Sequence, residues 1–189
     1  MNEPQISGYV FAGGKSRRMG TDKALLTIEN QPILLRMINL IKPSCDYLAI
    51  SGQNAEYSFL NLEMVPDVYA GCGPISGIYS CLKNSKTDWI LIISVDVPFV
   101  TEEFIRFLIS NISETDCVIP KHDSGLEPLV ALYHKHTLPV VEEMIRTGDY
   151  KLMNLLAKLD AKYLDCTDIL ISNPRLFHNL NNPDDYRSI

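Results

Sequence analysis

The stretch that most restricts how this chain can fold is an apolar run that leads directly into a glycine-rich, basic loop near the amino terminus. Residues 6–11 read ISGYVF, and an alanine and two glycines follow without a break. The loop then carries these residues: Lys15, Arg17, Arg18, Gly20, Asp22 and Lys23. Glycines let backbone N–H groups approach a ligand, and the cations neutralise an anion held there. Because ligands of α/β proteins bind beyond the carboxyl ends of strands, the pattern predicts a polyphosphate site here.

Two common phosphate-binding motifs do not fit this loop. A Walker A sequence ending at residues 14–16 would require a glycine at position 9, which is Tyr9. The dinucleotide motif G-x-G-x-x-G also fails, because Gly13 and Gly14 are adjacent and the next glycine is Gly20. The sequence therefore argues against both a P-loop ATPase and an ordinary dinucleotide-binding dehydrogenase.

The composition is that of an ordinary globular protein. The chain has 189 residues, of which 46% are hydrophobic, and no linker or low-complexity tract divides it. We therefore expect a single domain over residues 1–189. The net charge of −6 argues against nucleic acid or an anionic membrane as a partner. A small anionic ligand would then depend on local cations, which the amino-terminal loop supplies.

The expected location of the protein and the redox state of its cysteines follow from patterns that the sequence lacks. Residues 1–7 are polar and show no signal-peptide pattern, and the apolar run at residues 89–93 is too short to span a bilayer. The five cysteines are scattered and never form C-x-x-C, which indicates reduced thiols and a cytoplasmic protein. His134 and His136 have no cysteine or third histidine close in sequence, so we do not expect a metal site there.

Strand-like and helix-like segments alternate along the chain, which predicts a three-layer α/β/α fold with a mostly parallel, Rossmann-like sheet. The run WILII at residues 89–93 shows no polar alternation, so we expect a central strand covered on both faces. Further strands are expected near residues 6–11, 47–50, 64–65, 117–120 and 129–133. Helices are expected from Pro32, after Pro74, after Thr101, after Thr137 and around Leu152 to Leu159, with a weak one at residues 55–60.

Asp96 lies just past the carboxyl end of the predicted central strand. A carboxylate at such a place is costly to bury without a partner. Magnesium is a natural partner if a triphosphate is nearby, since it takes one or two carboxylates together with phosphate oxygens. Asp in an Asp-x-Pro sequence also forms turns, so the residue alone leaves both roles open.

Taken together, these segments resemble the molybdenum cofactor guanylyltransferases (MobA), members of the nucleotidyltransferase superfamily. The resemblance covers residues 7–186 and is carried by the loop at 12–23 and by GPISG at 73–77, DVPF at 96–99, EPLVALY at 127–133 and NLNNPDD at 179–185. It implies a fold of the nucleotide-diphospho-sugar transferase type. The chain departs from the family pattern at Phe11, where leucine is usual, at Ser51, where asparagine is frequent, and at Asn182, which replaces threonine.

The resemblance implies an activity: transfer of GMP from GTP to the molybdopterin cofactor (Mo-molybdopterin), with release of pyrophosphate and with Mg²⁺ as the cofactor. Cofactor-synthesis and molybdoenzyme-maturation proteins would be further partners. A cytidylyltransferase on the same cofactor, a sugar-phosphate nucleotidyltransferase and a non-catalytic GTP-binding regulator are the alternatives. Gly14 and the Asp22–Lys23 pair favour the guanylyl branch, and the presence of both Lys23 and Asp96 argues against a regulator.

The resemblance also assigns roles to individual residues. The catalytic residues would be Arg17, Lys23 and Asp96, with Asp96 as the metal ligand. The nucleotide-binding residues would be Phe11, Ala12, Gly13, Gly14, Lys23, Ser51, Asp67, Gly73 and Asp96. The acceptor-binding residues would be Lys151, Asn179 and Asn181. Asp67 could accept N–H groups of guanine or bond a ribose hydroxyl, although Pro-Asp is also a common turn. Gly77 would allow close approach either of a base or of the sheet.

Overall fold

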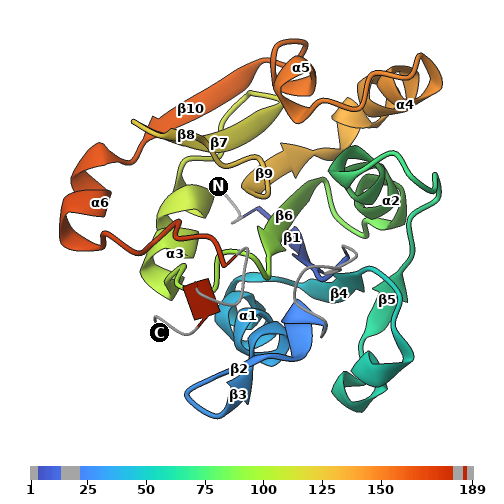
Figure 1. Ribbon diagram of the computed structural model, residues 1–189. Coiled ribbons are helices and arrows are strands. Elements are labelled where there is room, and N and C mark those ends of the chain that lie inside the picture. Colours follow the sequence, from blue (N-terminus) through green and yellow to red (C-terminus); the bar gives the residue numbers. More distant parts are fainter. Residues whose placement is uncertain (1–3, 14–21, 181–184, 187–189) are drawn as a thin grey trace.

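The computed structural model describes residues 4–13, 22–180 and 185–186, and these build a central sheet with helices on both faces (Figure 1). Along the sheet the strand order is β10-β7-β9-β6-β1-β4-β5, and β8 pairs with β7. The strands are β1 (Ile6–Phe11), β4 (Tyr47–Ser51), β5 (Glu63–Val65), β6 (Trp89–Ser94), β7 (Cys117–His122), β8 (Gly125–Leu126), β9 (Val130–His134) and β10 (Ala161–Asp165). A separate hairpin joins β2 (Thr27–Ile28) to β3 (Gln31–Pro32).

Most of the sheet is parallel. β1 runs parallel to both β4 and β6, and the pairs β4–β5 and β7–β10 are also parallel. β9 is antiparallel to both of its neighbours, β6 and β7. Every residue of β6 is buried, because β1 and β9 flank it and helices cover both faces. The predicted fold class and the predicted central strand are therefore confirmed.

Six α-helices lie in the described residues: α1 (Ile33–Ile41), α2 (Pro74–Asn84), α3 (Glu102–Ser110), α4 (Leu138–Arg146), α5 (Leu152–Leu156) and α6 (Thr167–Ser172). Helices α1 and α3 and the segment around Phe177 share one apolar cluster with one face of the sheet. Helices α2, α4 and α5 cover the opposite face (Figure 1). None of the helices in the described part of the chain is long and apolar enough to cross a membrane.

Local details differ from the expectations in three places. Pro32 ends the β2–β3 hairpin and is the N-cap of α1, so the helix begins one residue later than predicted. Residues 55–60 form a 3-10 helix instead of a weak α-helix. Thr137 precedes α4 without capping it, because its hydroxyl donates to the backbone oxygen of His134 (2.8 Å). Thr101 does cap α3, accepting from the Phe104 N–H (3.2 Å).

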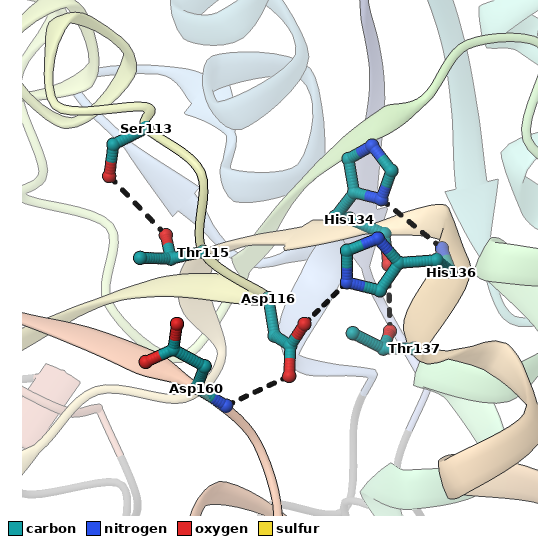
Figure 2. Close-up of polar contacts among 7 residues, drawn as sticks. All are labelled: Ser113, Thr115, Asp116, His134, His136, Thr137 and Asp160. Atoms are coloured by element: carbon teal, nitrogen blue, oxygen red, sulfur yellow. Dashed lines mark hydrogen bonds and ion pairs between the residues drawn. The ribbon is translucent and has the colours of Figure 1, made fainter.

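A polar cluster lies at the end of the sheet where β6 begins (Figure 2). His134 pairs with Trp89, the first residue of β6. The His136 ring nitrogen Nε2 bonds one carboxylate oxygen of Asp116, and the Asp160 N–H donates to the other (2.8 Å). These contacts tie the end of β9 to the beginnings of β7 and β10, so the cluster has a clear structural role.

Candidate active site

The carboxyl ends of β1, β4 and β6 meet at one edge of the sheet. Phe11, the last residue of β1, is in register with Ser51 on one side and with Ser94 on the other. Beyond the strands, the Ala12 N–H donates to the Ser51 oxygen (3.0 Å) and the Val95 N–H donates to the Phe11 oxygen (3.1 Å). The start of the glycine-rich segment therefore lies between the end of β4 and the turn that carries Asp96.

The predicted nucleotide-binding residues at the ends of β1 and β4 fall into two groups. Ala12 and Gly13 lie at this edge of the sheet. Phe11 and Ser51 end their strands here but are only 7% and 2% exposed, so both belong to the floor of the site. Gly14, the remaining residue of this prediction, lies outside the described residues, as do the predicted catalytic residue Arg17 and the predicted acceptor residue Asn181.

Lys23 and Asp96, the two predicted catalytic residues that the structure describes, form an ion pair. The Lys23 ammonium donates to Asp96 Oδ1 at 2.7 Å. The Lys23 side chain is 11% exposed, whereas that of Asp96 is 42% exposed. Asp96 therefore has a protein partner, which the sequence reasoning did not foresee, and it still presents part of its carboxylate to solvent.

Asp22 holds the segment that carries Lys23. One oxygen of Asp22 accepts from the Ala24 N–H (3.0 Å) and so caps a short 3-10 helix at Lys23–Leu25. The other oxygen accepts from Asn54 Nδ2 (2.8 Å) and from the Tyr57 hydroxyl (2.6 Å). Burial, together with the hydrogen bond to Asp22, raises the pKa of Tyr57, so this hydroxyl remains a donor. Sequence reasoning missed Asn54 and Tyr57, because nothing local in the sequence links them to position 22.

Gly77 lies in α2 and packs directly against β1. A Cβ at this position would come within 2.7 Å of the Phe11 ring and 3.3 Å of the Ser51 hydroxyl. Real side chains do not approach so closely without a shift. Of the two explanations that the sequence left open for Gly77, this contact supports packing against the sheet.

The loop before α2 is fastened to that helix. The Val68 and Tyr69 N–H groups donate to the hydroxyls of Ser80 (3.0 Å) and Ser76 (3.2 Å). Gly73, the N-cap of α2, has a φ of 69°, a conformation that favours glycine, and the space around it is open. Asp67, which begins this loop, has a pKa raised by partial desolvation. The loop thus offers a carboxylate and an uncrowded backbone beside the end of β4.

On the side of Asp96 away from the glycine segment, a cavity of about 110 Å³ lies between the end of β6 and the start of β9. Its lining combines polar and apolar groups: Ser94, Asp96, Val97, Glu127, Pro128, Leu129, Val130 and Asn179. The chain that follows Asn179 is attached here, since the Leu180 N–H donates to the backbone oxygen of Asp96 (2.8 Å). The structure therefore brings Asn179, a predicted acceptor residue, together with Asp96. Glu127 also lines this cavity, and sequence reasoning gave it no role of its own.

Lys151, the other predicted acceptor residue in the described chain, lies elsewhere. It is exposed and precedes α5. It is not among the residues that line the cavity beside Asp96. Its assignment to the acceptor remains a prediction.

The donor atoms around Asp96 fit a nucleotide-bound magnesium ion. Such an ion needs only one or two protein carboxylates, because phosphates and water complete its coordination. Asp96 supplies one partly exposed carboxylate at the edge where the glycine segment begins. In residues 4–13, 22–180 and 185–186 no group of three or more His, Cys, Asp or Glu side chains is placed to hold a metal ion on its own.

Comparison with known proteins identifies relatives over nearly the whole chain. Residues 8–163 match the MobA-like NTP transferase domain. A probable molybdenum cofactor guanylyltransferase of Flavobacterium johnsoniae is 30% identical over 187 residues, which cover 97% of this chain and 96% of the relative. Another, from Pelotomaculum thermopropionicum, is 32% identical and covers 96% of this chain and 90% of the relative.

Among solved structures, the molybdopterin-guanine dinucleotide biosynthesis protein A of Archaeoglobus fulgidus superposes with a TM-score of 0.81. The match covers 96% of this chain and 95% of that protein, at 24% sequence identity. At this level of identity the comparison supports the fold, in agreement with the strand order described above.

Proposed function

Because the chain belongs to the MobA-like NTP transferase family, we propose that it transfers GMP from GTP to the molybdopterin cofactor and releases pyrophosphate. Relatives of 30% and 32% identity that match almost end to end carry the name molybdenum cofactor guanylyltransferase. The structural observation that carries the proposal is the pair of Lys23 and Asp96, a cation and a carboxylate 2.7 Å apart beside the start of the glycine segment. A cation and a carboxylate so placed suit the transfer of a nucleotidyl group.

The reaction requires alignment and charge neutralisation more than a strong base. A phosphate oxygen of the acceptor attacks the α-phosphorus of GTP, and the bond to the bridging oxygen breaks as pyrophosphate leaves. Because the attacking phosphate is already anionic, no proton needs to be removed from it. Fixed cations and N–H groups lower the barrier by stabilising the charge that develops on the leaving group.

Each residue of the site has a part in this scheme. The N–H groups of the glycine segment, together with Arg17 and Lys23, would hold the triphosphate. Asp96 would hold Mg²⁺, which, when bound, polarises the α-phosphate. Asp67 and Gly73 would contact the nucleoside, since they lie beyond β4 and β5 on the side of β1 away from β6. Asn179 and Asn181 would face the acceptor.

The arrangement of the strands separates donor from acceptor. In the order β9-β6-β1-β4-β5, the proposed nucleotide residues lie at β1, β4 and the loop after β5. The cavity beside Asn179 lies between β6 and β9. Asp96 follows β6 and therefore stands between the two sides. A residue in this position can contact the phosphate at which the two substrates meet.

A direct assay tests the proposal. Purified protein is incubated with Mg²⁺, molybdopterin cofactor and each nucleoside triphosphate in turn, and pyrophosphate release is followed. We expect release with GTP only. Release with CTP would indicate the cytidylyl alternative, and GTP binding without turnover under any condition would indicate a regulator. Either result would refute the proposal.

Two variants test the mechanism, and a third serves as their control. Asp96→Ala and Lys23→Ala should lose at least about 100-fold in kcat, as removal of one group that stabilises the transition state commonly does. Arg106→Ala removes a cation from an exposed ion pair on α3 and should leave the rate unchanged. Near-normal GMP transfer by either of the first two variants would contradict the assigned roles.

We also propose that residues 1–189 form one catalytic domain that works in the cytoplasm, with cofactor-synthesis and molybdoenzyme-maturation proteins as partners. The two apolar clusters support the first point, since they lie on the two faces of one sheet. Co-purification of the protein with a molybdoenzyme chaperone would test the partnership.

A further inference from the structure

Glu127 lies near Asp96, just beyond the paired parts of β6 and β9. These strands are antiparallel, with Ile93 in register with Val130. Asp96 comes three residues after Ile93 and Glu127 three residues before Val130, so both lie just beyond the last pair of this register. Both residues line the cavity between the strand ends. The fold therefore places a second carboxylate beside the proposed centre of reaction, on the side away from the nucleotide residues.

The Glu127 side chain is held in a fixed orientation. It is only 17% exposed, and His122, which is 10% exposed, lies 3.1 Å from its Oε1. His122 Nδ1 accepts from the Ser124 N–H (3.3 Å), so in the neutral ring the proton is on Nε2, which donates to Glu127. The His122 ring is stacked on Phe177 at a centroid distance of 5.1 Å and an angle of 14°.

Phe177 is itself fixed by an edge-on contact with Phe104 (5.2 Å, 83°). Glu127 is thus at the end of a chain of packed rings, with one oxygen bonded to His122 and the other directed to no partner among the described residues. A carboxylate can accept up to four hydrogen bonds, so most of its capacity is free for a ligand. Such support is typical of a preorganised binding group.

The groups that line the cavity indicate which kind of ligand it can bind. Val97, Pro128, Leu129 and Val130 form apolar walls, and a few polar groups complete the lining. This mixture suits a flat heterocycle better than a hydrated ion. An ionised carboxylate repels phosphate and thiolate groups but accepts N–H donors strongly. Of the groups in molybdopterin, only the pyrimidine edge of the pterin, with its 2-amino group and its ring N–H, offers such donors side by side.

We propose that Glu127 binds the pterin ring of the acceptor, its carboxylate accepting the 2-amino and ring N–H groups. Glu127 is then a specificity residue for the acceptor and His122 a positioning residue for Glu127. The inference rests on the proposed function, because it takes molybdopterin as the acceptor. Guanine carries a similar edge, but the nucleotide residues lie beyond β1 and β4, on the opposite side of Asp96.

A binding experiment without GTP or turnover tests the inference separately from the function. Pterin and lumazine, in which an oxygen replaces the 2-amino group, are titrated against the wild type and against Glu127→Gln. We expect the wild type to bind pterin about tenfold tighter than lumazine, since a hydrogen bond to a charged group is worth at least this factor. Glu127→Gln should lose the preference. Glu103→Gln, an exposed change on α3, should keep it.

Steady-state kinetics supply the second readout. Glu127→Gln should raise KM for molybdopterin about tenfold and leave KM for GTP unchanged. A rise in KM for GTP alone would assign Glu127 to guanine and overturn the inference. A wild type without preference for pterin over lumazine would also overturn it, and this outcome does not depend on whether a variant folds. Failure of the wild type to transfer GMP would refute the proposed function instead and leave the pterin titration interpretable.

Discussion

The support of Lys23 by Asp22 can be tested by removing one hydroxyl group. The Tyr57 hydroxyl donates to Asp22 Oδ2 at 2.6 Å, and Tyr57 is only 1% exposed. Tyr57→Phe retains the ring and its packing and removes only the hydroxyl, which also lies 3.3 Å from the backbone oxygen of Ala12. Asp22 keeps its hydrogen bonds from Asn54 and from the Ala24 N–H. The variant therefore weakens the support of the Asp22 carboxylate without removing all of it.

The expected loss of stability depends on whether the hydrogen-bond acceptor is charged. A hydrogen bond to a charged group contributes about 1.5–3 kcal/mol to stability, against about 0.5–1.5 kcal/mol for a neutral pair. Tyr9→Phe is a matched control, because the Tyr9 hydroxyl donates to a neutral amide oxygen, Asn84 Oδ1 (2.9 Å), which keeps a second bond from Tyr47 (3.1 Å). We therefore expect Tyr57→Phe to lose about 2 kcal/mol and Tyr9→Phe about 1 kcal/mol.

Urea unfolding, with the same dependence of unfolding free energy on urea concentration for each variant, measures both losses of stability. The melting temperature should fall by about 4–8 °C for Tyr57→Phe and by about 2–4 °C for Tyr9→Phe. Activity provides the second comparison. Because Asp22 caps the segment that carries Lys23, Tyr57→Phe should also raise KM for GTP, whereas Tyr9→Phe should not. If Tyr57→Phe proves no more destabilising than Tyr9→Phe, or if it leaves GTP binding intact, Asp22 does not position Lys23 in the way described.

Two further predictions concern packing and pH. Gly77→Ala should raise KM for GTP, because the new methyl group would displace the Phe11 ring beneath the nucleotide site, and steady-state kinetics at saturating acceptor measures this. Desolvation alone would raise the pKa of Asp116, but the Asp160 N–H and His136 hold it below its usual value of 3.8. The ionised form therefore stabilises the fold above pH 3.8, and this contribution is lost as the pH falls through the lower folded-state pKa. Asp116→Asn should be less stable than the wild type in urea at pH 7, and the difference should shrink in acid.

The sequence predicted those features that depend on local pattern. The unbroken apolar run at residues 89–93 identified the central strand, because only a strand covered on both faces lacks polar positions. The hydroxyl of Thr101 before two glutamates identified the start of α3. The position of Asp96 after the central strand placed it at the site edge, since parallel strands present their carboxyl ends together.

Other features depend on contacts between distant segments, and no spacing in the sequence encodes them. Asn54 and Tyr57 reach Asp22 only because a 3-10 helix follows β4 at the same edge. The sequence offered a metal ion or a turn as explanations for Asp96 and gave no sign that Lys23 donates to one of its oxygens. Glu127 and Asp96 line one cavity because β9 runs antiparallel to β6 and so begins at the edge where β6 ends. The alternation of helices and strands does not determine this direction.

The ion pair of Lys23 and Asp96 suggests how the Asp96 carboxylate could stabilise the fold and also take part in the proposed reaction. A lysine with a side chain only 11% exposed needs an anionic neighbour, and Asp96 Oδ1 supplies it. The Asp96 side chain is nevertheless 42% exposed, so it can meet a cation carried by the nucleotide without first breaking the pair. In the proposed mechanism, the charge of the entering triphosphate would add to that of Asp96 around the same ammonium group. Lys23 would then be fixed in advance at the point where negative charge increases, and such preorganisation would lower the barrier to transfer.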